Sequence, residues 1–208
     1  MNEETDKILK IITLGSSEVG KTCILHRYFN NIFQENLLST IGIDIRTKYF
    51  KFNEEKIKMN FIDTAGQEKF RAISVNYLKG TNGVILVFDI TKKDTFDLIE
   101  TWIEEINQNN KTNIGKILLG NKSDLEIDRE VQKEDAIKLA EKLGCKYFEG
   151  SAKTGENITE ALNTVARETY ESWQKYKEEE NRHSIRLSSA DSGSVNRVSF
   201  EEKKKCCN

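Results

Sequence analysis

The 208-residue sequence contains no proline and only four cysteines, and it has no long apolar run. Cys23, Cys145, Cys206 and Cys207 show neither the spacing of a metal site nor that of a disulfide framework. The first apolar stretch, Ile8–Leu14, is too short for a signal peptide or a membrane span. Acidic and basic residues nearly balance, at 34 and 32, which disfavours nucleic acid as a partner. We therefore expect a cytosolic, monomeric globular domain without disulfides.

Short apolar runs alternate with loops and helical patterns along most of the chain. The runs are Ile8–Leu14, Val84–Phe88, Ile117–Leu119 and Lys146–Phe148. This alternation is typical of βα units around a parallel sheet. Between the first two runs, Ile43–Phe52 and Lys56–Ile62 are joined by Asn53-Glu54-Glu55, which predicts a hairpin and one antiparallel strand. The pattern indicates an α/β domain with a mixed sheet.

Helical spacing of apolar residues marks three segments that face the core, ending with the stripe from Ile158 to Ala166. After about Tyr176 this periodicity stops, and Ser, Glu, Arg and Asn dominate the sequence. Residues 178–208 are therefore predicted to be a disordered tail that follows a single domain of residues 1–177.

The run Gly15-Ser16-Ser17-Glu18-Val19-Gly20-Lys21-Thr22 fits the pattern G-x-x-x-x-G-K-[ST] between a predicted strand and a predicted helix. Glycine is needed where backbone N–H groups curl around a polyphosphate, and the helix N-terminus adds partial positive charge. Lys21 is expected to reach the β- and γ-phosphates. Thr22 is expected to offer its hydroxyl to Mg²⁺, which prefers hard oxygen ligands. We assign residues 17–23 to a nucleotide site, although the side chain of Cys23 is expected to serve packing.

A phosphate loop does not choose between ATP and GTP, so the base must be recognised elsewhere. Asn121-Lys122-Ser123-Asp124 follows the apolar run Ile117–Leu119. A carboxylate such as Asp124 can accept hydrogen bonds from both N1–H and the 2-amino group of guanine, which adenine cannot satisfy. Lys122 can lay its aliphatic stem along the base. Ser151-Ala152-Lys153, at the end of the next predicted strand, is placed to direct a backbone N–H at the guanine 6-oxo group.

The segment Asp63-Thr64-Ala65-Gly66-Gln67-Glu68 ends the second hairpin strand, at the edge of the sheet where ligands of α/β proteins collect. Asp63 is predicted to be a second Mg²⁺ partner, acting through water. Gly66 can bring its N–H close to the γ-phosphate. Gln67 is the predicted catalytic residue, because it is positioned to orient the attacking water.

These motifs, in this order, resemble the Ras-like small GTPases over residues 7 to about 177. Within that group the chain is most similar to the Rab family, on the basis of Ser39–Asp44, Asp63–Glu68, Leu86–Thr91 and the paired terminal cysteines. The resemblance implies a three-layer P-loop NTPase fold with a six-stranded, mostly parallel sheet, one antiparallel strand, and helices on both faces. It also implies that Thr40 completes the Mg²⁺ shell, that Phe33 packs against the guanine ring, and that residues near 31–44 and 64–80 are two switches.

The same resemblance implies a GTP and GDP cycle that regulates vesicle trafficking. Its partners would be an exchange factor, a GTPase-activating protein, a GDP-dissociation inhibitor or escort protein, and effectors. The segment Asn31–Asp44 contains no arginine, so intrinsic hydrolysis should be slow. Rab proteins usually carry aromatic residues where this chain has Ile45 and Ile62, and only Tyr77 of that trio remains.

The sequence ends in three lysines, two cysteines and an asparagine. A C-a-a-X signal needs cysteine at the fourth position from the end, where this chain has Lys205. Adjacent Cys206 and Cys207 instead resemble the doubly geranylgeranylated tails of Rab proteins, and two lipid chains are what stable anchoring requires. The expected location is the cytoplasmic face of an intracellular membrane, with a soluble cytosolic pool.

Two other functions share the phosphate loop. One is a GTP-dependent membrane scaffold with negligible hydrolysis, against which Gln67 argues. The other is a metabolic kinase, for which the sequence shows no site for an acceptor substrate, while Asp124 selects guanine over adenine.

Overall fold

The computed structural model describes residues 7–34, 43–64, 78–109 and 114–191. Its strands are β1 (Lys7–Leu14), β2 (Ile43–Phe52), β3 (Glu55–Thr64), β4 (Gly83–Asp89), β5 (Gly115–Asn121) and β6 (Lys146–Glu149). Its helices are α1 (Lys21–Asn30), α3 (Lys93–Asp97), α4 (Ile99–Asn109), the 3-10 helix η2 (Ser123–Asp128), α5 (Lys133–Leu143) and α6 (Ile158–Asp191).

The six strands form one sheet in the order β2-β3-β1-β4-β5-β6, in which only the β2–β3 pair is antiparallel. The predicted mixed sheet and hairpin are therefore confirmed. The hairpin turn is tighter than expected, because Phe52 pairs with Glu55 and leaves two residues between the strands. Asn53 has φ of 48°, and asparagine tolerates this left-handed conformation better than most residues.

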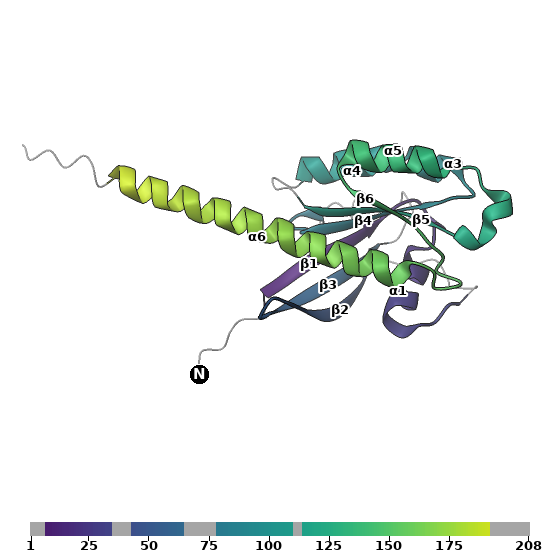
Figure 1. The fold of residues 1–208 in the computed structure, drawn as a ribbon, viewed down its shortest axis with the longest axis horizontal. Coiled ribbons are helices and arrows are strands. Elements are labelled where there is room, and N and C mark those ends of the chain that lie inside the picture. The colour runs from purple at the N-terminus through teal and green to yellow at the C-terminus, as the bar shows by residue number, and fades with distance from the viewer. Residues whose placement is uncertain (1–6, 35–42, 65–77, 110–113, 192–208) are drawn as a thin grey trace, which may run out of the picture.

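Helices cover both faces of the sheet, so the predicted three-layer fold is confirmed (Figure 1). α1 and α6 lie on one face, where Ile11 and Phe61 join the buried helix residues Ile24 and Leu162. α3, α4 and α5 lie on the other face, above a second apolar cluster. Every residue of β4 is buried, which explains its continuous apolar run, since a central parallel strand is covered on both sides.

Helix α6 is longer than the sequence suggested. Among the side chains described up to residue 183, Trp173 is the last of the helix that packs on the core, yet the backbone remains helical to Asp191, along the part that leads away from the sheet (Figure 1). The backbone of residues 178–191 is thus helical in the structure, and the disorder of the tail stays a prediction. Apolar periodicity indicates which residues of a helix pack on a core, and it gives no sign of an exposed helix. The exposed part of α6 instead contains polar pairs one turn apart, such as Tyr176 with Glu180, which stabilise a helix. Residues 192–208 lie outside the described part of the chain.

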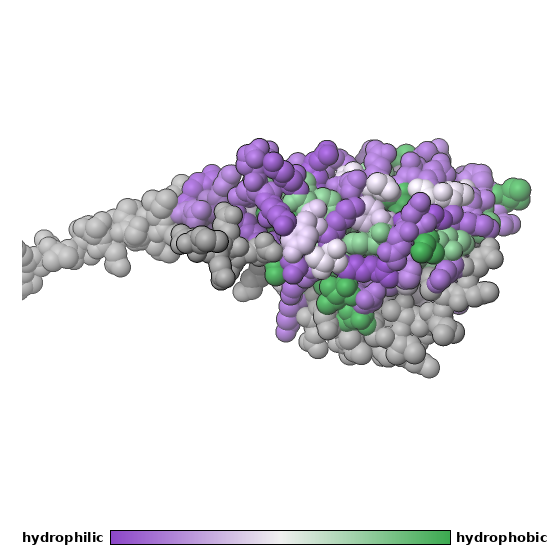
Figure 2. All heavy atoms as spheres, turned by 90° about the horizontal axis from the view of Figure 1, so that it is seen from below, coloured by the Kyte–Doolittle hydropathy of each residue, from purple (hydrophilic) through white to green (hydrophobic). Residues whose placement is uncertain are grey.

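Figure 2 shows one face of the molecule, which is mainly hydrophilic and on which hydrophobic residues form a few small, separated groups. Among the helices that the structure describes, none combines the length and apolar composition needed to cross a bilayer.

Two glycines let α6 approach the sheet closely. A Cβ on Gly115, the first residue of β5, would lie 2.4 Å from the backbone nitrogen of Thr169. A Cβ on Gly83 in β4 would lie 2.0 Å from the Thr169 hydroxyl. Because backbone cannot rotate away as a side chain can, the contact at Gly115 is the stricter constraint.

We predict that Gly115→Ala lowers the free energy of unfolding by about 1–3 kcal/mol, the usual effect of overpacking. Urea unfolding under identical buffer and ligand conditions measures this change. The matched control is Gly144→Asn, at a position with φ of 63° and no atom near the added Cβ. Asparagine tolerates that conformation, so the control should stay within about 0.5 kcal/mol of the parent. Equal stability of Gly115→Ala and the parent would contradict the close packing of α6.

Candidate functional site

The loop between β1 and α1 wraps around the ammonium group of Lys21. Lys21 Nζ donates hydrogen bonds to the carbonyl oxygens of Gly15 at 2.9 Å and Ser16 at 2.8 Å. The side chain is almost fully buried, and this burial lowers the pKa of Lys21 to about 8, although the nearby Asp63 carboxylate raises it. The loop therefore holds the ammonium group of Lys21 beside the N-terminus of α1. The N-cap residue there, Gly20, makes no side-chain hydrogen bond to the backbone N–H groups of the helix.

Both glycines of the loop motif are required by packing as well as by conformation. Gly15 has φ of 148°, and a Cβ there would lie 2.1 Å from the carbonyl oxygen of Val87 in β4. Gly20 has φ of 94°, and a Cβ there would lie 2.3 Å from Nδ2 of Asn121. The two glycines of the phosphate-loop pattern are therefore needed for two reasons. They allow the positive φ angles, and they leave room for the close contacts with β4 and β5.

Thr22 and Asp63, the two described residues that were predicted to serve Mg²⁺, meet beside this loop. The Thr22 hydroxyl donates to Asp63 Oδ2 at 2.7 Å. Asp63 is the last residue but one of β3 and is buried, and its Oδ1 has no hydrogen-bond partner among the described residues. Burial raises the pKa of Asp63, partly opposed by the hydrogen bond from Thr22 and the charge of Lys21. An unpaired buried carboxylate oxygen next to a hydroxyl is the arrangement that a hard cation would complete.

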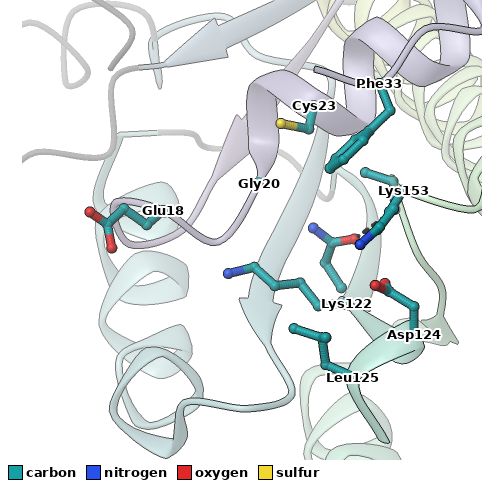
Figure 3. Close-up of a pocket in the computed structure, with 10 residues that line it drawn as sticks. Glu18, Gly20, Cys23, Phe33, Lys122, Asp124, Leu125 and Lys153 are labelled. Atoms are coloured by element: carbon teal, nitrogen blue, oxygen red, sulfur yellow. Dashed lines mark hydrogen bonds between the residues drawn. The ribbon is translucent and has the colours of Figure 1, made fainter. Parts of the chain in front are cut away.

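A pocket of about 260 Å³ lies beyond the loop and contains most of the predicted base-binding residues (Figure 3). Its lining consists of Glu18, Gly20, Cys23, Phe33, Asn121, Lys122, Asp124, Leu125, Ala152 and Lys153. This volume is slightly below the roughly 300–1,000 Å³ of pockets for drug-sized ligands. It suits one ring system, with any phosphates lying outside over the loop.

Asn121 joins the phosphate loop to the base pocket. Its side-chain Nδ2 donates to the Val19 carbonyl at 2.7 Å, and its Oδ1 accepts from the Ala152 backbone N–H at 3.0 Å. The residue is 2% exposed. The Ala152 N–H, one candidate for the guanine 6-oxo contact, therefore already donates to Asn121 Oδ1. The oxygen of a bound base would be the second acceptor of this N–H, in a bifurcated hydrogen bond.

Asp124, the predicted guanine acceptor, is exposed at the pocket. Its Oδ1 accepts a hydrogen bond from the buried Ser151 hydroxyl at 2.5 Å. Its desolvation would come from the bound base rather than from the fold. The Ser151 hydroxyl also accepts from the backbone N–H groups of Lys153 and Thr154, both at 3.1 Å.

Lys122 is held by a partner that sequence reasoning missed. Its Nζ lies 2.5 Å from Oδ2 of Asp89, a fully buried carboxylate at the end of β4. Asp89 could have been recognised, because it ends an apolar strand at the same sheet edge as Asp63. With Nζ anchored there, the aliphatic stem of Lys122 crosses the pocket toward the side on which Glu18 lies (Figure 3).

The remaining predicted residues divide into three groups. Glu18 points away from the other labelled side chains and pairs with Lys92 at 3.4 Å (Figure 3). Cys23 packs against the core, as expected, but also lines the pocket. Phe33 packs on the same core cluster at the pocket wall, and Ser17 is partly buried.

Several predicted site residues lie outside the described ranges. They are Thr40, Gly66, Gln67, Tyr77, Cys206 and Cys207. Of the two departures from the family pattern, Ile62 is 2% exposed, whereas its cross-strand partner Ile45 is 50% exposed.

Comparisons with known proteins agree with the geometry. The model of the Ras family matches residues 10–171. The chain is 42% identical to the Ras-related protein Rab-13 of Canis lupus familiaris over 168 residues, which cover 81% of this chain and 83% of that protein. It is 39% identical to the GTP-binding protein ypt2 of Schizosaccharomyces pombe over 202 residues, 97% of both chains. It is also 41% identical to the human Ras-related protein Rab-8B, over 81% of each chain.

The predicted resemblance is thus confirmed by a match that spans the phosphate loop, both base loops and the core of the sheet. The chain belongs to the Ras family of small GTPases, and it is a Rab-like member that hydrolyses GTP and regulates vesicle trafficking.

Proposed function

We propose that GTP lies with its guanine in the pocket at Asp124 and its phosphates over the loop at Lys21. The observation that carries this proposal is that Gly20 belongs to both the phosphate loop and the pocket wall. A single ligand can therefore contact Asp124 and Lys21 together. In this position Asp124 accepts from N1–H and the 2-amino group, Lys122 covers one face of the base, and Phe33 contacts the ring from the pocket wall.

The residues beside the loop fit a Mg²⁺ ion. Asp63 supplies an unpaired buried oxygen and Thr22 a hydroxyl, and Thr40 is proposed as a third partner. In the described part of the chain, no group of three or more His, Cys, Asp or Glu could hold a metal ion. This fits Mg²⁺, which usually relies on one or two protein ligands together with phosphate oxygens and water. When bound, the ion would neutralise charge that develops on the phosphates.

Hydrolysis would depend on residues that bind the γ-phosphate and on a residue that orients the attacking water. Lys21 would donate to the β- and γ-phosphate oxygens, and the Gly66 N–H would donate to the γ-phosphate. Gln67 orients the water that attacks the γ-phosphorus, so that its approach lies in line with the leaving oxygen. No arginine occurs between Asn31 and Asp44, so this chain lacks an internal cation for the transition state in that segment.

Regulators and membrane attachment complete the proposal. An exchange factor, a GTPase-activating protein, a GDP-dissociation inhibitor and effectors are the partners that a slow nucleotide switch requires. Geranylgeranyl groups on Cys206 and Cys207 would hold the chain at the cytoplasmic face of an intracellular membrane, with support from the adjacent lysines. The proposal is supported by the Rab-like relatives and by the paired cysteines.

We predict that single-turnover GTP hydrolysis by the purified chain is slower than about 1 per minute, on the scale of intrinsic rates in this fold. Gln67→Leu should reduce that rate by about tenfold or more, because the attacking water loses its orienting group. Phosphate release from preloaded GTP in the presence of Mg²⁺ measures both rates. Equal rates for the two proteins would instead favour the membrane scaffold, in which Gln67 has no catalytic part.

The lowered pKa of Lys21 predicts a pH dependence of GDP binding. Without phosphates the amine loses its proton as the pH rises through about 8, whereas bound phosphates favour the ammonium and raise its pKa. Binding above pH 8 must therefore take up a proton, and affinity should fall by up to about tenfold per pH unit. Calorimetry at pH 8.5 in two buffers of different ionisation enthalpy measures this uptake.

Lys21→Arg is the control for this titration, because the guanidinium stays charged at all accessible pH values. The variant should bind more weakly but without this proton uptake. The titration of the guanine ring is common to both proteins and cancels in their difference. The same proton uptake in both would show that Lys21 is not the titrating group.

A further inference from the structure

The segment that carries Asp124 has no core packing of its own. η2 contains no buried residue, and Ile127 within it is fully exposed. Leu125 departs from helical geometry, with φ of −103° and ψ of 40°. A segment with these properties cannot be held by apolar burial, so polar contacts must fix the position of Asp124 relative to the pocket.

Three hydrogen bonds join η2 to the loop after β6. The Ser123 backbone N–H donates to the Gly150 carbonyl at 3.1 Å, the Ser123 hydroxyl donates to Glu156 Oε2 at 3.1 Å, and the Ser151 hydroxyl donates to Asp124 Oδ1 at 2.5 Å. All three involve the first two residues of η2, so none of them holds its later half.

Arg129 connects the later half of η2 to the end of β6. Its Nη2 lies 2.5 Å from Oε2 of Glu126 and 2.6 Å from Oε1 of Glu149. Glu126 comes two residues after Asp124, and Glu149 comes two residues before Ser151. One guanidinium therefore bridges the two segments that recognise the base, and it does so without lining the pocket.

The hydrogen bonding of Arg129 is complete. Its Nε donates to Glu126 Oε1 at 2.8 Å, and its Nη1 donates to the Val131 carbonyl at 2.9 Å and to Glu149 Oε2 at 3.2 Å. Together with the two Nη2 bonds, these use all five N–H donors of the guanidinium. The side chain is 11% exposed and that of Glu149 is 14% exposed, so solvent screens their contact little. Such a fork fixes direction as well as distance.

Glu149 is itself fixed from two sides. The Tyr147 hydroxyl donates to Glu149 Oε2 at 2.6 Å, and the Asn157 side chain donates to the Glu149 carbonyl at 2.7 Å. Burial raises the pKa of Glu149, but the hydrogen bonds from Arg129 and Tyr147 outweigh it and hold the pKa below its usual value. The carboxylate is therefore charged at neutral pH, and its fixed position gives the Arg129 guanidinium a fixed partner.

We infer that Arg129 is a positioning residue for guanine selectivity, which holds the Asp124 segment against the Ser151 loop through its bridge between Glu126 and Glu149. The inference rests on the proposed role of Asp124 as the guanine acceptor. Loss of the bridge lets η2 move outward, and the two hydrogen bonds that Asp124 accepts from guanine weaken more than the contacts that any purine would keep.

The test compares GDP with inosine diphosphate, which lacks the 2-amino group. Dissociation constants for both are measured in Mg²⁺ by competition against fluorescent GDP, for the full chain and for Arg129→Met, Glu149→Gln, Asp124→Asn and Lys142→Met. Lys142 pairs with Glu100 on the surface at 2.6 Å, away from the pocket, and controls for the loss of a basic side chain. Arg129→Lys replaces Arg129→Met if the latter does not fold, because lysine keeps the charge but not the fork.

The expected result is that Arg129→Met reduces the preference for GDP over inosine diphosphate by about tenfold, the effect of losing one well-placed charged hydrogen bond. Glu149→Gln reduces it in the same direction, and Lys142→Met leaves it unchanged. A merely structural role would lower the melting temperature and both affinities without changing their ratio, and that outcome overturns the inference. So does a reduced ratio in Lys142→Met.

The Asp124→Asn arm separates the inference from the function on which it rests. If Asp124→Asn lowers the ratio and Arg129→Met does not, the base site stands and the role of Arg129 is wrong. If Asp124→Asn leaves the ratio unchanged, the assignment of the guanine acceptor itself fails, and the inference fails with it.

Discussion

The side-chain amide of Asn121 holds the two halves of the nucleotide site together. Its nitrogen donates to Val19 in the phosphate loop, and its oxygen accepts from Ala152 in a base loop. Both groups are buried, so neither can exchange its partner for water without cost. Gly20 approaches so closely that a Cβ would strike Asn121 Nδ2, which means that the loop, the strand end and the base loop form one packed unit.

The parallel sheet makes this arrangement possible. β1 is followed by the phosphate loop, β3 ends at Thr64 just after Asp63, and Asp89 of β4 lies in register with Asn121 of β5. Parallel neighbours bring their carboxyl ends to one edge, so residues far apart in sequence converge there. The antiparallel β2 runs the other way, which places Ile43 beside Thr64 and thereby starts that strand at the site. Topology, rather than any single motif, assembles the pocket.

Much of this could be predicted from sequence, because its signals are local. The apolar runs of β1, β4 and β5 and the Asn53 turn each reflect burial or a backbone conformation within a few residues. The phosphate loop was recognisable because glycine and lysine are needed at fixed spacing. The Asp124 loop could be placed for a similar reason, since it follows the end of an apolar strand.

The parts that could not be predicted depend on contacts between distant segments or on exposed structure. The bridge of Arg129 to Glu149 spans 20 residues and leaves no periodic trace. Residues 175–183 of α6 are exposed, so the apolar stripe that ends near Tyr176 gives no sign that the helix continues. The exposure of Asp124 follows from the absence of buried residues in η2, a property of the three-dimensional path of the loop.

If Asn121 couples the phosphate loop to the base loop, its replacement should weaken both at once. Asn121→Asp keeps the shape and the acceptor for Ala152 but sets an oxygen against the Val19 carbonyl. The direct measurement is the dissociation rate of fluorescent GDP in Mg²⁺, compared with Asn163→Asp on α6, where only an acceptor for the Tyr28 hydroxyl is involved. The account predicts that Asn121→Asp accelerates dissociation by about tenfold or more, the effect of an unsatisfied buried polar pair. It also predicts little change for Asn163→Asp, and equal, small changes in the two variants would contradict it.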